Sequence, residues 1–247
     1  MPFPARSRSR GLVSLLAGAA ALLPVRQACA CGASTGGAAG VSSCSLEEHE
    51  EAMRRKWEAG VSYSFTSTAL HFSDGHEFDE QRRATLAALD YQPTARTAIR
   101  AGAGVLAGGT LRAAAGRYDL APGFVGVVGG SWRVVDASGA VPFVLLTAQL
   151  SYAGTSAASA AYDAFDLRAG TMVGTTLWRT LTPYVLGRAF GGPVYWRYGG
   201  AAVTGTDVHH YQVGGGIAVV VARRVDAFVE GVALGEQGLS FGLGVSL

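Results

Sequence analysis

The stretch that decides the fold is GLSFGLGVSL, residues 238–247, with which the sequence ends. Its apolar side chains alternate with glycine and serine, at Leu239, Phe241, Leu243, Val245 and Leu247. A period of two places the two sets of residues on opposite faces of a β-strand. A strand this apolar needs a partner on both edges, so the stretch predicts a sheet in which the last strand is not a free edge.

The same alternation recurs from Trp57 onward. In WEAGVSYSFT, residues 57–66, the larger side chains occupy the odd positions and small or polar ones mostly occupy the even positions. With glycine, proline and polar clusters taken as turns, we expect about ten strands, with eight or twelve as alternatives. They fall at residues 57–72, 79–91, 97–110, 124–135, 142–152, 164–177, 183–195, 208–221, 225–234 and 239–247.

Short and long connections alternate between these strands. YQPTAR, DASGAV, RTLT and ARR are short, whereas residues 113–123, 153–163 and 196–207 read as longer loops. The less apolar face of each predicted strand carries mostly glycine, serine and alanine with almost no lysine. This composition suits a narrow lumen better than the solvent-exposed face of a soluble β-sandwich. The fold class predicted is all-β: a closed antiparallel up-and-down transmembrane β-barrel whose final strand pairs with the first.

Aromatic residues fall near the predicted strand ends, as the two interfacial girdles of a membrane barrel would. On the short-turn side they are Trp57, Tyr91, Trp132, Trp178 and Tyr184. On the longer-loop side they are Phe72, Tyr118, Phe124, Tyr152, Tyr162, Tyr195, Trp196, Tyr198 and Tyr211.

The N-terminal residues read as an export signal. A basic segment with Arg6, Arg8 and Arg10 precedes an apolar stretch and Ala28-Cys29-Ala30, so we expect a cleaved signal peptide over 1–30. Residues 31–56 are then a periplasmic leader with a short helix, and 57–247 the barrel. Cys31 and Cys44 predict a disulfide, with a lipid-modified Cys31 as the alternative. Cleavage changes the net charge from +2 to −2, which excludes a nucleic-acid-binding footprint.

Over residues 57–247 the chain resembles the outer-membrane β-barrels of Gram-negative bacteria, a class that includes small porin-like and transporter-like barrels. The resemblance implies location in the bacterial outer membrane and contact with its lipid. It also implies recognition of the C-terminal strand by the outer-membrane assembly machinery. Leu247 departs from the pattern, because that position is usually aromatic in the class.

Several charged residues fall on the predicted inward face: Arg100, Arg133, Asp166, Arg168, Arg188 and Glu230. Arg188 and Glu230 lie at matching heights on two strands that flank a glycine-rich one, so we expect an ion pair between them across the lumen wall. Such a pair would cancel charge inside a narrow barrel or line a charge-selective passage.

Histidine and carboxylate residues gather near the predicted outer loops. A divalent metal ion would take ligands from His71, His76, His209, His210, Asp74 and Asp207. The alternative is that these are solvated loops. The same residues, with Asp79, permit a remote resemblance to the water-activating Asp and His groups of omptin proteases, although that family's sequence motifs are missing.

The glycine-rich GAGVLAG and VGGGIA lie within predicted strands, so they predict no phosphate-binding loop and no cofactor. We therefore expect a non-enzymatic narrow pore, or a barrel that transports or binds a small-molecule solute. The alternative is a plugged structural or adhesive surface barrel whose loops bind a partner or a metal ion.

Overall fold

The computed structural model describes residues 56–247, apart from 115, 138–140, 158–159, 179 and 199. The predicted signal peptide, leader helix and Cys31–Cys44 disulfide lie outside these residues. Within them, no helix is long and apolar enough to cross a membrane.

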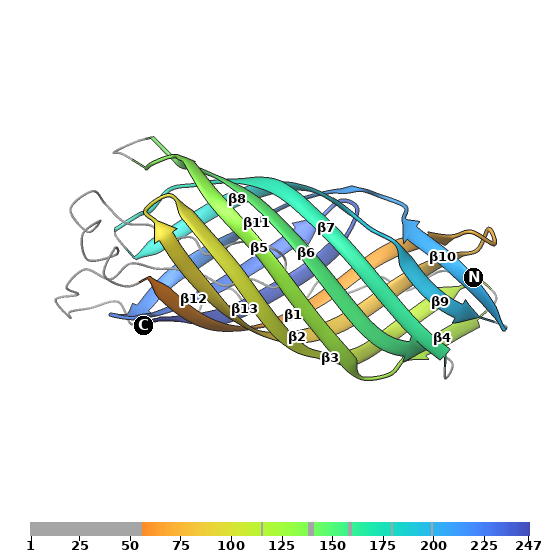
Figure 1. The fold of residues 1–247 in the computed structure, drawn as a ribbon. Coiled ribbons are helices and arrows are strands. Elements are labelled where there is room, and N and C mark those ends of the chain that lie inside the picture. The colour runs from red at the N-terminus through yellow and green to blue at the C-terminus, as the bar shows by residue number, and fades with distance from the viewer. Residues whose placement is uncertain (1–55, 115, 138–140, 158–159, 179, 199) are drawn as a thin grey trace, which may run out of the picture.

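The described chain forms one antiparallel sheet of thirteen strand segments (Figure 1). They are β1 (Trp57–Phe72), β2 (Glu77–Thr94), β3 (Thr97–Ala113), β4 (Gly116–Leu120), β5 (Gly123–Val135), β6 (Phe143–Ala157), β7 (Ala160–Gly174), β8 (Leu181–Gly191), β9 (Val194–Tyr198), β10 (Ala201–Asp207), β11 (Tyr211–Ala222), β12 (Val225–Ala233) and β13 (Gln237–Ser246).

Three of these segments continue the strand before them, so the thirteen make a ring of ten barrel strands. β3 pairs with β5 over Thr97–Leu106 and with β4 over Gly109–Ala113, and β7 pairs with both β8 and β9. Pro122 and Pro193 lie at these two breaks, where proline removes a hydrogen-bond donor from the ladder. β10 continues into β11 across residues 208–210.

The last strand closes the ring, as the closing alternation predicts. β13 pairs with β1 in antiparallel register from Glu58↔Ser246 to Ser67↔Gln237. Leu239, Phe241 and Leu243 are half exposed on the outside, whereas Ser240 is buried on the lumen side. The architecture is that of an up-and-down transmembrane β-barrel. We call the end with Trp57 and Ser246 the terminal end, and the end with the β1–β2 turn the far end.

The ring narrows toward the far end, because the β12–β13 hairpin is short. Above the tip of this hairpin β1 pairs with β10 instead, from Leu70↔Asp207 to Phe72↔Gly205. The far end is therefore closed by eight strand segments: β1, β2, β3, β4, β6, β7, β9 and β10. Figure 1 shows β4, β9 and β10 together at that end, opposite the C-terminus.

The two halves of the wall have opposite polarity. On the terminal half, the outward residues of β1, such as Val61 and Phe65, are exposed and apolar. On the far half, the outward residues are exposed and mostly polar or charged: His71, Asp79, Arg83, Arg117, Asp119, Thr204 and Thr206. Apolar side chains point inward there instead, so the far half has an apolar interior and a polar outer surface, whereas the terminal half has an apolar outer surface and a polar interior.

The inward residues of the far half form a close-packed core, which we call the far cluster. Its buried members are Leu70, Phe72, Phe78, Leu106, Leu111, Leu120, Ala153, Ala157, Tyr162, Ala164, Val194, Trp196 and Val203. Trp196 is 1% exposed and meets the rings of Phe72 and Phe78 edge to face, at 6.0 and 5.5 Å between ring centres. This part of the lumen is filled by side chains.

Two expectations from the sequence are wrong here. Residues 113–123, 153–163 and 196–207 are mostly extensions of the strands rather than long loops, since extended backbone finds ladder partners all the way to the far end. Phe72, Tyr162 and Trp196 do not belong to an outer aromatic girdle, because they face the far cluster, and Tyr184 likewise points inward. Phe124, Tyr195 and Tyr211 are exposed on the outside.

Candidate functional site in the lumen

Below the far cluster, charged side chains occupy the lumen in layers. In the layer within the terminal half, Arg188 of β8 donates hydrogen bonds to both carboxylate oxygens of Glu230 on β12, at 3.0–3.2 Å. Both side chains are almost fully buried. The hydroxyl of Tyr184 donates to Glu230 at 3.1 Å, so the carboxylate is held from two sides.

Glycines create the space that this pair needs. β11 lies between β8 and β12, and its Gly216 stands opposite both Tyr184 and Glu230 in register. A Cβ atom at Gly216 would lie 2.5 Å from the Tyr184 hydroxyl, and one at Gly170 would lie 2.5 Å from the Cγ atom of Arg188. The lumen-side glycines therefore allow large polar side chains to cross over a neighbouring strand.

A second charged layer lies at the tip of the β12–β13 hairpin. Glu236 is 2% exposed and accepts hydrogen bonds from Nη1 and Nη2 of Arg168 at 2.8 and 2.7 Å. Nε of Arg168 donates to Asp166, and the guanidinium lies 5.4 Å from the centre of the Phe190 ring. Arg168 thus joins the β7 wall to the hairpin tip.

The hairpin tip is held in an unusual backbone conformation. Leu234 and Gly235 have φ angles of 69° and 76°, in the left-handed region. A Cβ atom at Gly235 would lie 2.1 Å from the backbone oxygen of Tyr211, so only glycine fits beneath the start of β11. The close fit under β11 places Glu236 inside the ring.

Arg82 on β2 has a different environment from Arg168. The atom of Arg82 nearest to a carboxylate is Nη1, 3.8 Å from Glu80, and Arg82 makes no hydrogen bond within the part of the chain that the structure describes. Glu80 itself accepts a hydrogen bond from Tyr162 at 3.0 Å. Arg82 is thus held by an ion pair but by no hydrogen bond, so its N–H groups can still donate to another acceptor.

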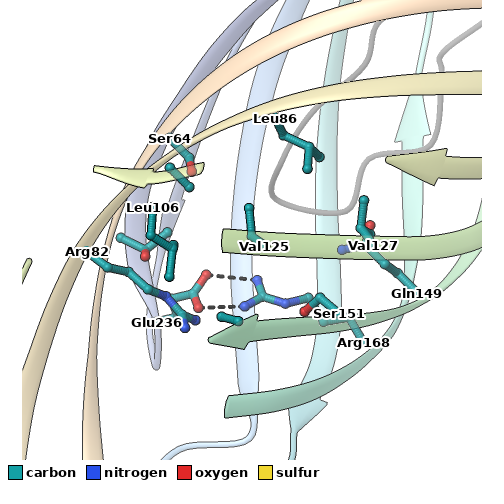
Figure 2. A pocket seen from close by; sticks show the side chains of 13 residues that line it. Ser64, Arg82, Leu86, Leu106, Val125, Val127, Gln149, Ser151, Arg168 and Glu236 are labelled. Carbon is teal, nitrogen blue, oxygen red and sulfur yellow. Dashed lines mark hydrogen bonds and ion pairs between the residues drawn. The ribbon is translucent and has the colours of Figure 1, made fainter. Parts of the chain in front are cut away.

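A cavity of about 70 Å³ lies beside Arg82, Arg168 and Glu236 (Figure 2). Its polar lining also includes Ser64, Thr66, Gln149 and Ser151, and its apolar lining consists of Ala84, Leu86, Leu106, Val125, Val127 and Ala153. Figure 2 shows the Arg82 guanidinium beside the Glu236 carboxylate, on the side away from Arg168. One side of the cavity can form hydrogen bonds and the other is apolar.

The other sequence-predicted lumen charges lie at the terminal end. Arg100 of β3 forms two hydrogen bonds of 2.8 Å with Asp90 of β2, and both residues are 2% exposed. Arg133 is also buried there. The sequence did not predict that Asp90, Arg82 and Glu236 lie in the lumen. Glu236 belongs to GEQG, which has the composition of a solvent-exposed turn.

The residues predicted as metal ligands do not converge in the part of the chain that the structure describes. In the described residues, no three His, Cys, Asp or Glu side chains are grouped so that they could hold a metal ion. The reason is that β1 and β10 are adjacent but their side chains diverge. Asp207 faces the lumen and accepts a hydrogen bond from Thr68 at 3.1 Å, whereas His71 is exposed and lies 3.6 Å from Glu77.

The rim histidines do not form the protease-like arrangement across two loops either. Nδ1 of His76 lies 3.0 Å from Oδ2 of Asp74 within the β1–β2 turn. Nδ1 of His210 lies 3.2 Å from the backbone oxygen of Phe190. Desolvation raises the pKa of Asp74, but hydrogen bonds from the backbone and ring of His76 together outweigh it, so this pKa lies below its ordinary value. The Asp74–His76 contact is thus a local turn interaction.

Comparison with solved structures finds other β-barrels at low sequence identity. The translocator domain of the autotransporter NalP from Neisseria meningitidis is 9% identical, with 82% of this chain and 93% of that chain covered and a TM-score of 0.44. The transport unit of the autotransporter AIDA-I from Escherichia coli is 12% identical, with 82% and 92% covered and a TM-score of 0.41. An outer membrane channel from Pseudomonas putida F1 is 12% identical, with 77% and 95% covered and a TM-score of 0.39. No family model and no curated protein matches the sequence.

Proposed function

We propose that the protein is a narrow barrel of the bacterial outer membrane that binds a small solute in its lumen and passes it when the far end opens, without a catalytic step. The observation that carries this proposal is the cavity beside Arg82 and Arg168. It lies where the packed far cluster ends and the polar lumen begins, so a solute from the terminal side would meet it before the closure.

The outer surface supports the placement in the membrane. The apolar outward residues of β1 run from Trp57 to Phe65, a length of roughly 20 Å for a tilted strand, close to the apolar band of outer-membrane barrels. Beyond Phe65 the outward surface becomes polar. In this proposal the terminal end faces the periplasm, the far half projects into water, and the β13 strand is the part that the assembly machinery reads.

Passage requires a movement, because the far cluster fills the lumen. Single-channel recording of the folded protein in planar bilayers tests this. We expect rare, small openings for the wild type and more frequent ones for Glu236→Gln, which weakens the bond between the hairpin tip and Arg168. Glu77→Gln, at the exposed β1–β2 turn, is the matched control and should leave the openings unchanged.

A second candidate function is favoured by the far half itself. A plugged barrel with a projecting polar surface would act as a structural or adhesive surface protein that binds a partner. If the wild type and Glu236→Gln are both folded and both silent in the bilayer, the pore proposal is wrong and this second candidate is favoured.

A further inference from the structure

We propose that the lumenal cavity binds a small carboxylate, and that Glu236 occupies the carboxylate position while the cavity is empty. This inference rests on the proposed function, since it names the class of solute. The group that already binds Arg168 is a carboxylate, that of Glu236 at the tip of the β12–β13 hairpin.

The geometry at Arg168 is that of carboxylate recognition. Two parallel N–H donors meet two carboxylate oxygens at 2.8 and 2.7 Å, a fork that matches the planar ligand. A free carboxylate can form the same two bonds. It would compete with Glu236, which directly follows the left-handed residues Leu234 and Gly235 in the hairpin turn.

Arg82 supplies the second point of attachment. Its guanidinium lines the cavity and is ion-paired with Glu80 at 3.8 Å, but it forms no hydrogen bond to any described residue. Each neighbouring carboxylate already accepts a hydrogen bond from a donor other than Arg82. Glu80 is bonded to Tyr162, Asp166 to Arg168 and the Gly191 amide, and Asp207 to Thr68. An added anion would therefore meet Arg82 donors that are ion-paired with Glu80 but form no hydrogen bond to the described residues.

The remaining lining sets the size and polarity of the ligand. Leu86, Leu106 and Val125 form an apolar surface that a compact oxyanion such as phosphate would leave uncovered. The volume of about 70 Å³ is roughly half that of a protein cavity known to hold benzene. The chemical class is thus a monocarboxylate with a short apolar body of about two to four carbons.

Titration of the folded, full-length protein in detergent with propionate tests the inference, by calorimetry or ligand-observed NMR. We expect millimolar binding that is weakened about 10-fold or more in Arg82→Gln, because a charge-assisted hydrogen bond is lost. Glu236→Gln should instead tighten binding several-fold, because the internal competitor loses its charge. Arg117→Gln, at an exposed arginine paired with Asp119 outside the lumen, should leave the affinity unchanged.

Inorganic phosphate and propylammonium distinguish the ligand classes. Equal binding of phosphate and propionate would overturn the assignment of a carboxylate with an apolar body, and tighter binding of propylammonium would overturn the assignment of an anion. Unchanged propionate affinity in both Arg82→Gln and Glu236→Gln would place any binding elsewhere. If Glu236→Gln does not fold, Glu236→Asp shortens the same side chain and should also tighten binding.

These measurements do not depend on conductance. A barrel that conducts but does not bind propionate leaves the proposed function standing and removes this inference. A barrel that binds propionate but never conducts, even as Glu236→Gln, keeps the carboxylate site and removes the transport step.

Discussion

Arg188 and Glu230 bond to each other across an intervening strand, with the guanidinium of one donating to both oxygens of the other at 3.0–3.2 Å. Removal of one partner leaves the other charge buried without its counter-ion, which costs about 3–5 kcal/mol. We therefore expect Arg188→Met to lower the free energy of unfolding by about that amount. Urea unfolding in lipid vesicles measures it.

The double variant Arg188→Met with Glu230→Gln is the control for this prediction. With both charges removed, the loss should be clearly smaller than the sum of the two single losses, as expected for a coupled pair. Additive losses would show that the two side chains do not stabilise each other.

Gly216→Ala should disturb the same layer without touching a charge. The added methyl group would lie 2.5 Å from both the Tyr184 hydroxyl and the Val229 backbone oxygen, so Tyr184 must move away from Glu230. We expect a loss of about 1–3 kcal/mol, the usual cost of overpacking. Gly126→Ala is the matched control, because a Cβ atom there meets nothing within 4 Å; an equal loss in both variants would contradict the steric explanation.

Charged substitutions on the outer face of β13 should lower the free energy of unfolding by an amount that depends on their depth in the bilayer. Leu243 pairs with Val61 in the middle of the apolar stretch, whereas Leu247 lies at its edge. We expect Leu243→Arg to cost about 2–4 kcal/mol in a bilayer and Leu247→Arg about 0–1 kcal/mol. Unfolding of both variants in vesicles gives the difference, and similar costs would mean that the apolar stretch is not centred in the lipid.

Trp196 should matter both for stability and for closure. Its side chain is buried in the far cluster and donates to the Ala157 backbone oxygen at 3.3 Å, so Trp196→Ala should cost about 3–5 kcal/mol. It should also raise bilayer conductance. Trp132→Ala, at a half-exposed position on the outside, is the control and should change neither quantity by a comparable amount.

Sequence periodicity is enough to predict the barrel and its closure. Strand faces follow from a period of two, and the alternation in residues 239–247 matches that of β1 along the whole β1–β13 ladder. Periodicity does not say which face is inside, however. In β1 the apolar residues move from odd positions, such as Val61 and Phe65, to the even positions Leu70 and Phe72. That shift, without any change of period, is the signal for the inverted far half.

The candidate site was only partly readable from the sequence. Arg168 could be placed on the lumen side by alternation, because it lies within a regular strand. Its partner Glu236 belongs to a turn, where no periodicity applies. Arg82 is a candidate binding residue only because it lines the cavity, which the sequence does not show. Contacts between strands distant in sequence depend on register and on the missing Cβ atoms of glycine, which local patterns do not encode.

The pairing of β1 with two different neighbours has a consequence for the circumference of the barrel. β1 pairs with β10 beyond the tip of the last hairpin, and β10 continues into β11 across residues 208–210. At the far end, the strands from β1 to β10 therefore form a closed ring without β12 and β13. The β12–β13 hairpin adds two strands to the terminal half only, and so widens that half alone. Deletion of the β12–β13 hairpin should let β11 pair with β1 and yield a narrower barrel with its far half intact.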